Sequence, residues 1–289
     1  MAYDHPLAPG THDVVVDGVP LRYHVAGEGP VCVMHSGGPG IDASYLRMPE
    51  VERSVTAVYL EPIGTGKSGR LPGHPHGYTI DRYSYFVAKL IEHLGEPRVY
   101  FLGHSHGGFV GQHYALDHPD RVAGLILYDS APTNGTEVWA DVGSNVEAFG
   151  RRYADLPESR RVLEAWKSLT SSGVWSDEEQ TEALREVFPM YFAEYWLRKT
   201  EFSSARDSFT STYVDGAGLP FDNRGKFVSF AVPTLLVVGR YDFICGPRWA
   251  KVLHDEIVGS ELVVLEHSGH FGHVEEAECF AAAVARFVG

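Results

Sequence analysis

The sequence predicts an α/β fold in which a mostly parallel sheet, flanked by helices, is interrupted by a helical insertion. Short, nearly continuous apolar runs recur along the chain, as expected for strands that are buried on both faces. Segments of helical periodicity alternate with these runs, which indicates right-handed crossovers between parallel strands. Residues 133–230 lack such runs and hold four of the five tryptophans, which predicts a separate helical segment.

The first part of the chain supplies strands and two helices. VVVDGVPLRYHV carries a DG turn between two β-rich runs and predicts a hairpin, and residues 31–35 and 55–60 follow as buried strands. A helix is expected from Thr79, a plausible N-cap, to Gly95, a plausible stop. Its apolar residues fall on one face: Tyr83, Phe86, Val87, Leu90, Ile91 and Leu94. Strands at 98–103 and 121–129 enclose a helix at 107–119.

The β/α pattern resumes after the insertion. Strands are expected at 232–239 and 261–267, and helices at 247–259 and 276–288. The predicted α/β core therefore comprises residues 1–132 and 231–289, and residues 133–230 form a helical module inserted between two of its strands.

Composition narrows the function classes. The chain has 289 residues and a net charge of −14, so nucleic acid and anionic membrane surfaces are not expected as partners. The N-terminus lacks the pattern of a signal peptide, and no apolar stretch is long enough to span a bilayer. Cys32, Cys245 and Cys279 form an odd, sparse set without CxxC, which predicts reduced thiols and a cytoplasmic location.

GHSHG, residues 103–107, is the sharpest chemical signal. It matches G-x-S-x-G and stands directly between a predicted strand and a predicted helix. A sharp strand-to-helix turn strains the serine backbone and exposes its hydroxyl, and glycines on either side let neighbouring elements approach. Ser105 is therefore predicted to be a nucleophile.

A serine nucleophile needs a base and an orienting acid, expected later in the chain on loops that follow strands. VVGRYD leads from a strand to Asp242, and VVLEHSGH leads from the next strand to His270. Asp129 also ends a strand and is the rival acid. His267 and His273 compete with His270, which follows a glycine in a loop. A metal bound by these three histidines is not expected because no further ligand cluster accompanies them.

The oxyanion of an acyl-transfer intermediate needs two backbone N–H donors. One is expected from His106, the residue after the nucleophile. The other is expected from the glycine loop HSGGPG, with Gly38 as first choice and Gly37 as second.

EPIGTGKSG, residues 61–69, imitates a phosphate-binding loop. The pattern G-x-x-x-x-G-K-[ST] requires glycine at position 61, where this chain has Glu61. A carboxylate there would face the phosphates, so no nucleotide and no other cofactor is expected.

Five pieces of the sequence resemble the α/β-hydrolase superfamily and, within it, the proline iminopeptidase-like branch. They are HSGGPG, EPIGTGKS, GHSHGG, YDFICGP and SGHFGHVEE, in the order of the family and over nearly the whole core. EPIGTGKS is similar to the family loop D-x-x-G-x-G-x-S, with Glu61 in place of aspartate. The resemblance implies a helical cap over the serine. It also implies hydrolysis through an acyl-enzyme, with Ser105 as nucleophile, His270 as base and then acid, and Asp242 as the residue that orients it.

The cap departs from the branch. Proline iminopeptidases hold the free amine of the substrate with cap glutamates, in a stretch ending G-x-E-F, and STYVDGAGLPFDN lacks that glutamate. Glu194, Glu201 and Asp215 are the remaining candidates. The sequence thus predicts a serine hydrolase of small amides or esters. An esterase or lactonase is the alternative, and a small-molecule-binding relative is the non-enzyme alternative. The substrate, its binding residues and the oligomeric state stay open.

Overall fold

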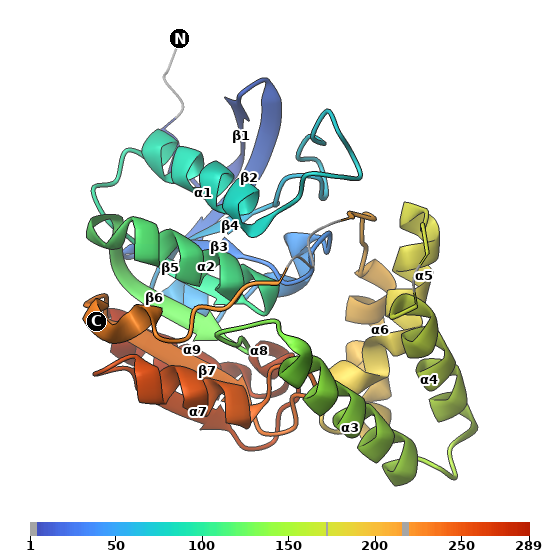
Figure 1. Cartoon of the computed structure of the whole chain (residues 1–289). Helices are drawn as coiled ribbons and strands as arrows, with labels where there is room; N and C mark the ends of the chain where they lie inside the picture. The colour runs from blue at the N-terminus through green and yellow to red at the C-terminus, as the bar shows by residue number, and fades with distance from the viewer. Residues whose placement is uncertain (1–4, 172, 216–219) are drawn as a thin grey trace.

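The computed structural model describes residues 5–171, 173–215 and 220–289 and confirms the α/β fold (Figure 1). An eight-stranded sheet has the order β1-β2-β4-β3-β5-β6-β7-β8. β1 pairs antiparallel with β2 and β2 antiparallel with β4, and all other neighbours are parallel. The strands are β1 Gly10–Val16, β2 Val19–Gly27, β3 Val31–His35, β4 Thr56–Leu60, β5 Val99–His104, β6 Val122–Tyr128, β7 Thr234–Gly239 and β8 Glu261–Leu265.

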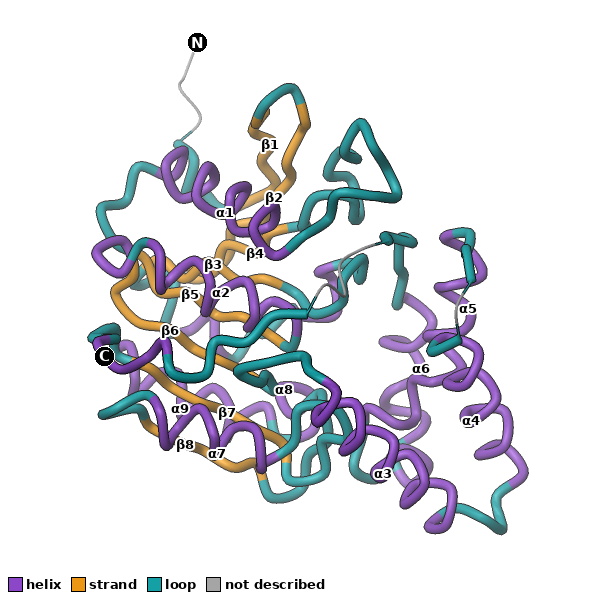
Figure 2. Tube along the Cα trace, viewed as in Figure 1, coloured by secondary structure: helices purple, strands orange, loops and turns teal. Residues whose placement is uncertain are grey.

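Helices cover both faces of the sheet (Figure 2). α1 (Ile80–Leu94), α2 (His106–Asp117) and α7 (Pro247–Glu256) share one hydrophobic cluster with one face. α9 (Ala277–Val288), which follows the short α8 (Gly272–Glu275), packs on the opposite face. Neighbouring residues of β5 enter different clusters, since Phe101 belongs to the first and Leu102 to the second. Burial on both faces explains why the strands read as continuous apolar runs.

The first helix shows how closely local signals set the boundaries. Thr79 caps α1, and its side chain accepts a hydrogen bond from the Arg82 N–H at 3.2 Å. Gly95 ends the helix with a φ of 77°, a left-handed conformation that glycine adopts readily. The six apolar residues expected on one face are all buried.

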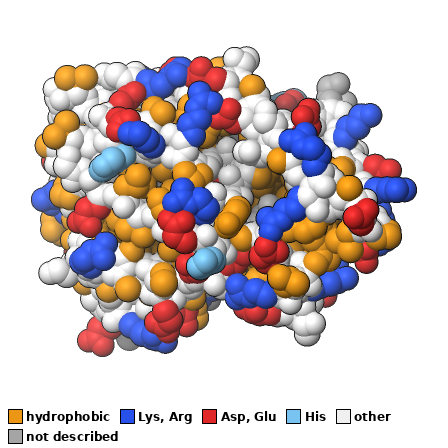
Figure 3. Space-filling view, turned by 90° about the horizontal axis from the view of Figure 1, so that it is seen from below, with side chains coloured by type: hydrophobic (Ala, Val, Ile, Leu, Met, Phe, Trp, Pro, Cys, Tyr) orange, Lys and Arg blue, Asp and Glu red, His pale blue; other side chains and the backbone are white. Residues whose placement is uncertain are grey.

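The described chain between β6 and β7 forms the helices α3 Thr136–Arg152, α4 Pro157–Leu169, α5 Asp177–Val187 and α6 Lys199–Ser208, and this inserted segment is called the cap below. They lie beside the carboxyl ends of the central strands, at the right of Figure 1. A cluster rich in aromatic residues joins them to the core, with Phe188 and Tyr191 of the cap packed on Phe271. Viewed from below, the surface is hollowed between core and cap, and hydrophobic side chains show in the hollow (Figure 3).

Within the described parts of the chain, none of the helices combines the length and the apolarity that a membrane crossing requires.

Candidate active site

Ser105 stands on a tight turn between β5 and α2. Its φ of 52° is rare for a residue with a side chain, and its N–H donates to the Tyr128 carbonyl at 2.9 Å. The flanking glycines are required by close packing. A Cβ on Gly103 would lie 2.2 Å from the Gly107 carbonyl oxygen, and one on Gly107 would lie 2.3 Å from the His35 carbonyl oxygen. The Ser105 side chain does not cap α2, so its hydroxyl is free to face the cavity described below.

Asp242 and His270 meet in the loops that follow β7 and β8. Asp242 Oδ1 lies 3.0 Å from His270 Nδ1, and both side chains are almost completely buried. The two side chains are thus in direct contact, although the geometry is not that of an aligned hydrogen bond. The Asp242 carboxylate also accepts the N–H groups of Ile244, at 2.8 Å, and Cys245, at 3.2 Å. The His270 N–H donates to the Tyr191 carbonyl at 2.7 Å, which fixes the loop.

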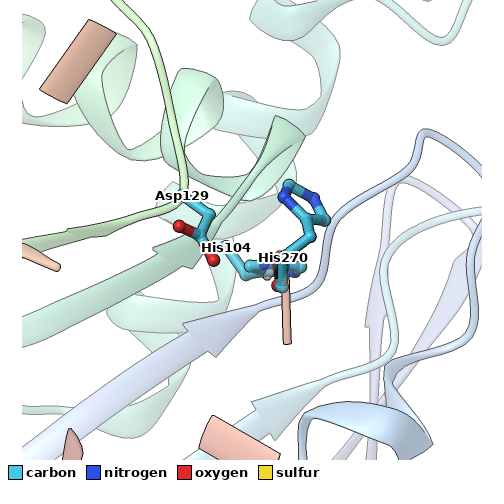
Figure 4. Close-up of side chains that lie close together, drawn as sticks. All are labelled: His104, Asp129 and His270. Atoms are coloured by element: carbon cyan, nitrogen blue, oxygen red, sulfur yellow. Dashed lines mark hydrogen bonds between the residues drawn. The ribbon is translucent and has the colours of Figure 1, made fainter. Parts of the chain in front are cut away.

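Asp129, the rival acid, lies beside Asp242 and within 4.8 Å of a His270 ring nitrogen, but among the described residues only Asp242 forms an ion-pair contact with that ring. Burial, followed by the charge of Asp242, holds the pKa of the Asp129 carboxyl well above its usual range. Asp129 Oδ1 accepts the Gly239 N–H at 2.8 Å, and no donor points at Oδ2 among the described residues. This is the pattern of a protonated carboxyl that donates from Oδ2 to a neighbouring carboxylate. Figure 4 shows Asp129 close to His104 and His270.

Tyr45 and His104, which the sequence did not single out, connect the glycine loop to the His270 loop. The Gly37 N–H donates to Tyr45 Oη at 2.7 Å, and Tyr45 Oη contacts His104 Nδ1 at 2.5 Å. His104 Nε2 lies 2.9 Å from the His270 carbonyl oxygen. A neutral His104 with its proton on Nε2 satisfies every partner, and burial lowers the pKa of His104 well below its ordinary value. The one sequence signal for His104 is its position next to Ser105.

His104, Asp129 and His270 also offer nitrogen and oxygen atoms within 4.8 Å of one another. Such a cluster can hold a metal when its lone pairs are free. Both ring nitrogens of His104 are hydrogen-bonded, however, and His270 Nδ1 faces Asp242. His104 therefore has no free nitrogen to offer, and the cluster keeps at most two open ligands, fewer than a metal centre needs.

The predicted oxyanion donors lie on either side of Ser105. His106 is the first residue of α2, where a backbone N–H has no acceptor within the helix. Gly38 shares a cavity wall with Ser105, and its N–H meets no acceptor in the described segments. Gly37 is close, since a Cβ on it would lie 3.1 Å from Ser105 Cβ. The Gly37 N–H is already donated to Tyr45, which leaves Gly38 as the better donor.

The competing histidines are placed differently from His270. His267 is exposed. His273 is buried between core contacts, with Nδ1 3.0 Å from Tyr128 Oη and Nε2 2.9 Å from the Tyr45 carbonyl oxygen. Burial lowers the pKa of His273 to about 4, so it stays neutral. Burial also raises the pKa of the Cys245 thiol, which argues against a reactive thiolate.

The stretch that imitates a phosphate loop is closed by its own side chains. The Glu61 carboxylate accepts the Lys67 N–H, and its other oxygen lies 2.7 Å from His24 Nε2. Ser68 Oγ donates to the Glu61 carbonyl at 2.6 Å. A Cβ on Gly66 would collide with the Glu61 carboxylate. The carboxylate thus occupies the position from which a phosphate would be bound.

A cavity with a volume of about 900 Å³ is walled by core and cap together. Ser105 and Gly38 belong to its core wall. The remaining walls are mainly apolar, and three of the cap tryptophans take part, namely Trp139, Trp166 and Trp175. A cavity of this size suits a small organic molecule.

Comparison with known proteins agrees with this architecture. A family model described as alpha/beta hydrolase fold matches residues 30–277. The chain is 27% identical to a proline iminopeptidase of Saccharolobus solfataricus over 92% of this chain and 87% of the relative. It is 25% identical to a proline iminopeptidase of Clostridioides difficile, covering 94% and 95%.

Solved structures share the fold. An enol-lactonase from Burkholderia xenovorans superposes with a TM-score of 0.70 at 23% identity, covering 96% of this chain and 99% of that one. An esterase from Exiguobacterium antarcticum gives a TM-score of 0.69 at 22% identity, with the same coverage. The resemblance to the proline iminopeptidase-like branch is thereby confirmed, and the chain belongs to the alpha/beta hydrolase fold family.

Proposed function

We propose that this protein is a serine hydrolase that cleaves a small-molecule ester or amide through an acyl-enzyme. The observation that carries the proposal is the buried contact between Asp242 and His270, 3.0 Å apart, beside the strained turn that presents Ser105 to the cavity. The hydrogen bond between His104 and the His270 carbonyl holds the Ser105 turn, called the elbow below, against the His270 loop, which supports the same function.

The proposed chemistry assigns one role to each residue. His270 Nδ1 faces Asp242, so Nε2 is the nitrogen that takes the Ser105 proton as the hydroxyl attacks the substrate carbonyl. The N–H groups of His106 and Gly38 receive the charge on the tetrahedral oxygen. His270 then returns the proton to the departing alcohol or amine. Water repeats the sequence on the acyl-serine and releases the acid.

Two types of scissile bond, an amide and an ester, are compatible with the relatives of this chain. Relatives that are proline iminopeptidases favour an amide of the aminopeptidase type, whereas structural neighbours that are an esterase and a lactonase favour an ester. We propose a small-molecule substrate, no nucleic acid or membrane partner, and a cytoplasmic location in keeping with the three free cysteines.

A nucleophile test separates this proposal from a binding-only role. Ser105→Ala is expected to lose about 10⁶-fold in turnover of p-nitrophenyl esters or aminoacyl anilides. Ser144→Ala is a matched control, because Ser144 is exposed and its hydroxyl donates to the Ala140 carbonyl of its own helix. Stopped-flow release of p-nitrophenol should show a burst in the wild type, the sign of an acyl-enzyme. Normal turnover in Ser105→Ala would overturn the proposal.

A further inference from the structure

The walls of the cavity carry more information about the substrate than the catalytic loops do. Large apolar side chains come from both sides, with Phe109 and Ile244 from the core and Trp139, Val142, Trp166 and Leu184 from the cap. Trp166 is fixed edge-on against Phe243, with ring centroids 5.3 Å apart. Such walls gain free energy by burying hydrocarbon or aromatic surface of a ligand.

The cavity is almost free of charge. Among the described residues that line it, Asp215 is the only carboxylate, and none is a lysine, arginine or histidine. Asp215 is half exposed, and its carboxylate lies 3.1 Å from His76 Nδ1.

The other acidic residues considered for amine binding are engaged elsewhere. Glu194 pairs with Arg152, and the Glu201 carboxylate takes two hydrogen bonds from Arg198, at 2.5 and 2.8 Å. Neither side chain belongs to the cavity wall. An ammonium group bound among the apolar walls would lose its water shell, and the one carboxylate of the described wall, Asp215, is half exposed and already paired with His76.

On the basis of the serine hydrolase function above, we propose that the cavity selects uncharged carboxylic esters with a large apolar acyl group and rejects substrates with a free ammonium group. This substrate class differs from that of the proline iminopeptidases to which the chain is similar. The divergence lies in the cap, whereas the catalytic loops keep the family pattern.

A pair of substrates that differ only in charge tests the inference. In 4-nitrophenyl heptanoate a methyl group stands where 4-nitrophenyl 6-aminohexanoate carries an ammonium. The heptanoate is expected to have a kcat/KM at least about 100-fold higher, because the ammonium is desolvated without a partner. Among neutral esters, kcat/KM should rise by about fourfold per added methylene from acetate to heptanoate. Equal or faster hydrolysis of the amino ester would overturn the inference and indicate that tryptophan faces hold the cation.

Variants locate the preference in the cavity. Trp166→Ala should lower kcat/KM for the heptanoate about tenfold more than for the acetate, because only the longer chain reaches the cap wall. Trp196→Ala is the matched control, since Trp196 is a cap tryptophan that packs on Phe149 and Tyr153 outside this cavity. Asp215→Asn should change the ratio of kcat/KM between the heptanoate and the 6-aminohexanoate by no more than about threefold. A fall in amino ester hydrolysis alone would make Asp215 an amine site and contradict the inference.

Labelling keeps the two proposals distinguishable. A fluorophosphonate probe modifies an activated serine whatever the natural substrate is. Labelling that disappears in Ser105→Ala, together with a preference for the amino ester, would retain the hydrolase function and overturn the substrate class. Absence of labelling in the wild type would remove the hydrolase function and the substrate class that rests on it.

Discussion

Two buried carboxyls end neighbouring strands and receive different contacts. Asp129 directly follows β6, and Asp242 stands in the loop after β7, the adjacent parallel strand. Asp242 lies against the His270 ring and accepts two backbone N–H groups. Burial and then the neighbouring charge of Asp242 raise the pKa of Asp129, which favours its protonated form. We infer that Asp242 orients the base and that Asp129 positions Asp242.

This division predicts unequal effects of two isosteric changes. Asp242→Asn is expected to lower kcat by roughly 10³- to 10⁴-fold, as the loss of an orienting carboxylate does in other triads. Asp129→Asn should stay within about tenfold of wild type, since an amide keeps both the acceptor for Gly239 and a donor toward Asp242. Steady-state kinetics on one ester measures both. The reverse ranking would make Asp129 the orienting acid.

At the scale of the elements, the elbow depends on backbone that packs against backbone. The space beside Gly107 is filled by the His35 carbonyl at the end of β3, and neither the strand nor α2 can shift without disturbing the sheet. Gly143, in α3 of the cap, shows the contrast, because a Cβ there would meet nothing within 4 Å.

The same substitution should therefore have opposite effects at the two positions. Gly107→Ala is expected to destabilise the protein by about 3 kcal/mol or more, because a Cβ would overlap a fixed carbonyl. Gly143→Ala should stabilise it by roughly 0.5–1 kcal/mol, since alanine is the better helix former. Urea denaturation followed by circular dichroism compares the two, and a mild effect of Gly107→Ala would mean that the elbow can relax.

At the scale of the whole molecule, several histidines are buried in their neutral form. Burial lowers the pKa of His35 to about 4, of His106 to about 3 and of His273 to about 4, and it lowers the pKa of His104 well below the ordinary value. Neither ring nitrogen of His106 has a hydrogen-bond partner in the described structure. Each of these side chains takes up a proton more readily when the chain unfolds.

Stability should consequently fall as the pH is lowered from about 6.5 toward 4. A depressed histidine pKa leaves stability intact above the unfolded value of 6.5 and removes it below, by about 1.4 kcal/mol per pH unit for each histidine. Asp129 and Glu275 have raised pKa values, Glu275 to about 7 mainly through burial, and they offset part of this loss. Urea denaturation at pH 7, 5.5 and 4.5 measures the slope. His106→Phe should flatten it, and a stability that is constant or rises toward pH 4.5 would contradict the assignment.

The sequence predicted the sheet and its covering helices because burial on two faces leaves a continuous apolar signature in each strand. It also identified Ser105, Asp242 and His270 as candidates, since strand ends and turn residues mark loops that converge in this fold. Two features could not be read from local pattern. The bridge from Tyr45 through His104 joins residues distant in sequence. The low charge of the cavity depends on which cap side chains point inward, and helical periodicity does not specify that for an inserted segment.

The insertion of the cap between β6 and β7 has a consequence for how the protein can vary. These two strands are hydrogen-bonded neighbours, yet about a hundred residues separate them along the chain. The conformational entropy lost in closing such a connection grows only with the logarithm of its length, by about 0.6 kcal/mol per doubling. Lengthening or exchanging the cap therefore changes the free energy of sheet assembly very little. Changes in the cap can therefore alter substrate preference while β6 and β7 keep their register.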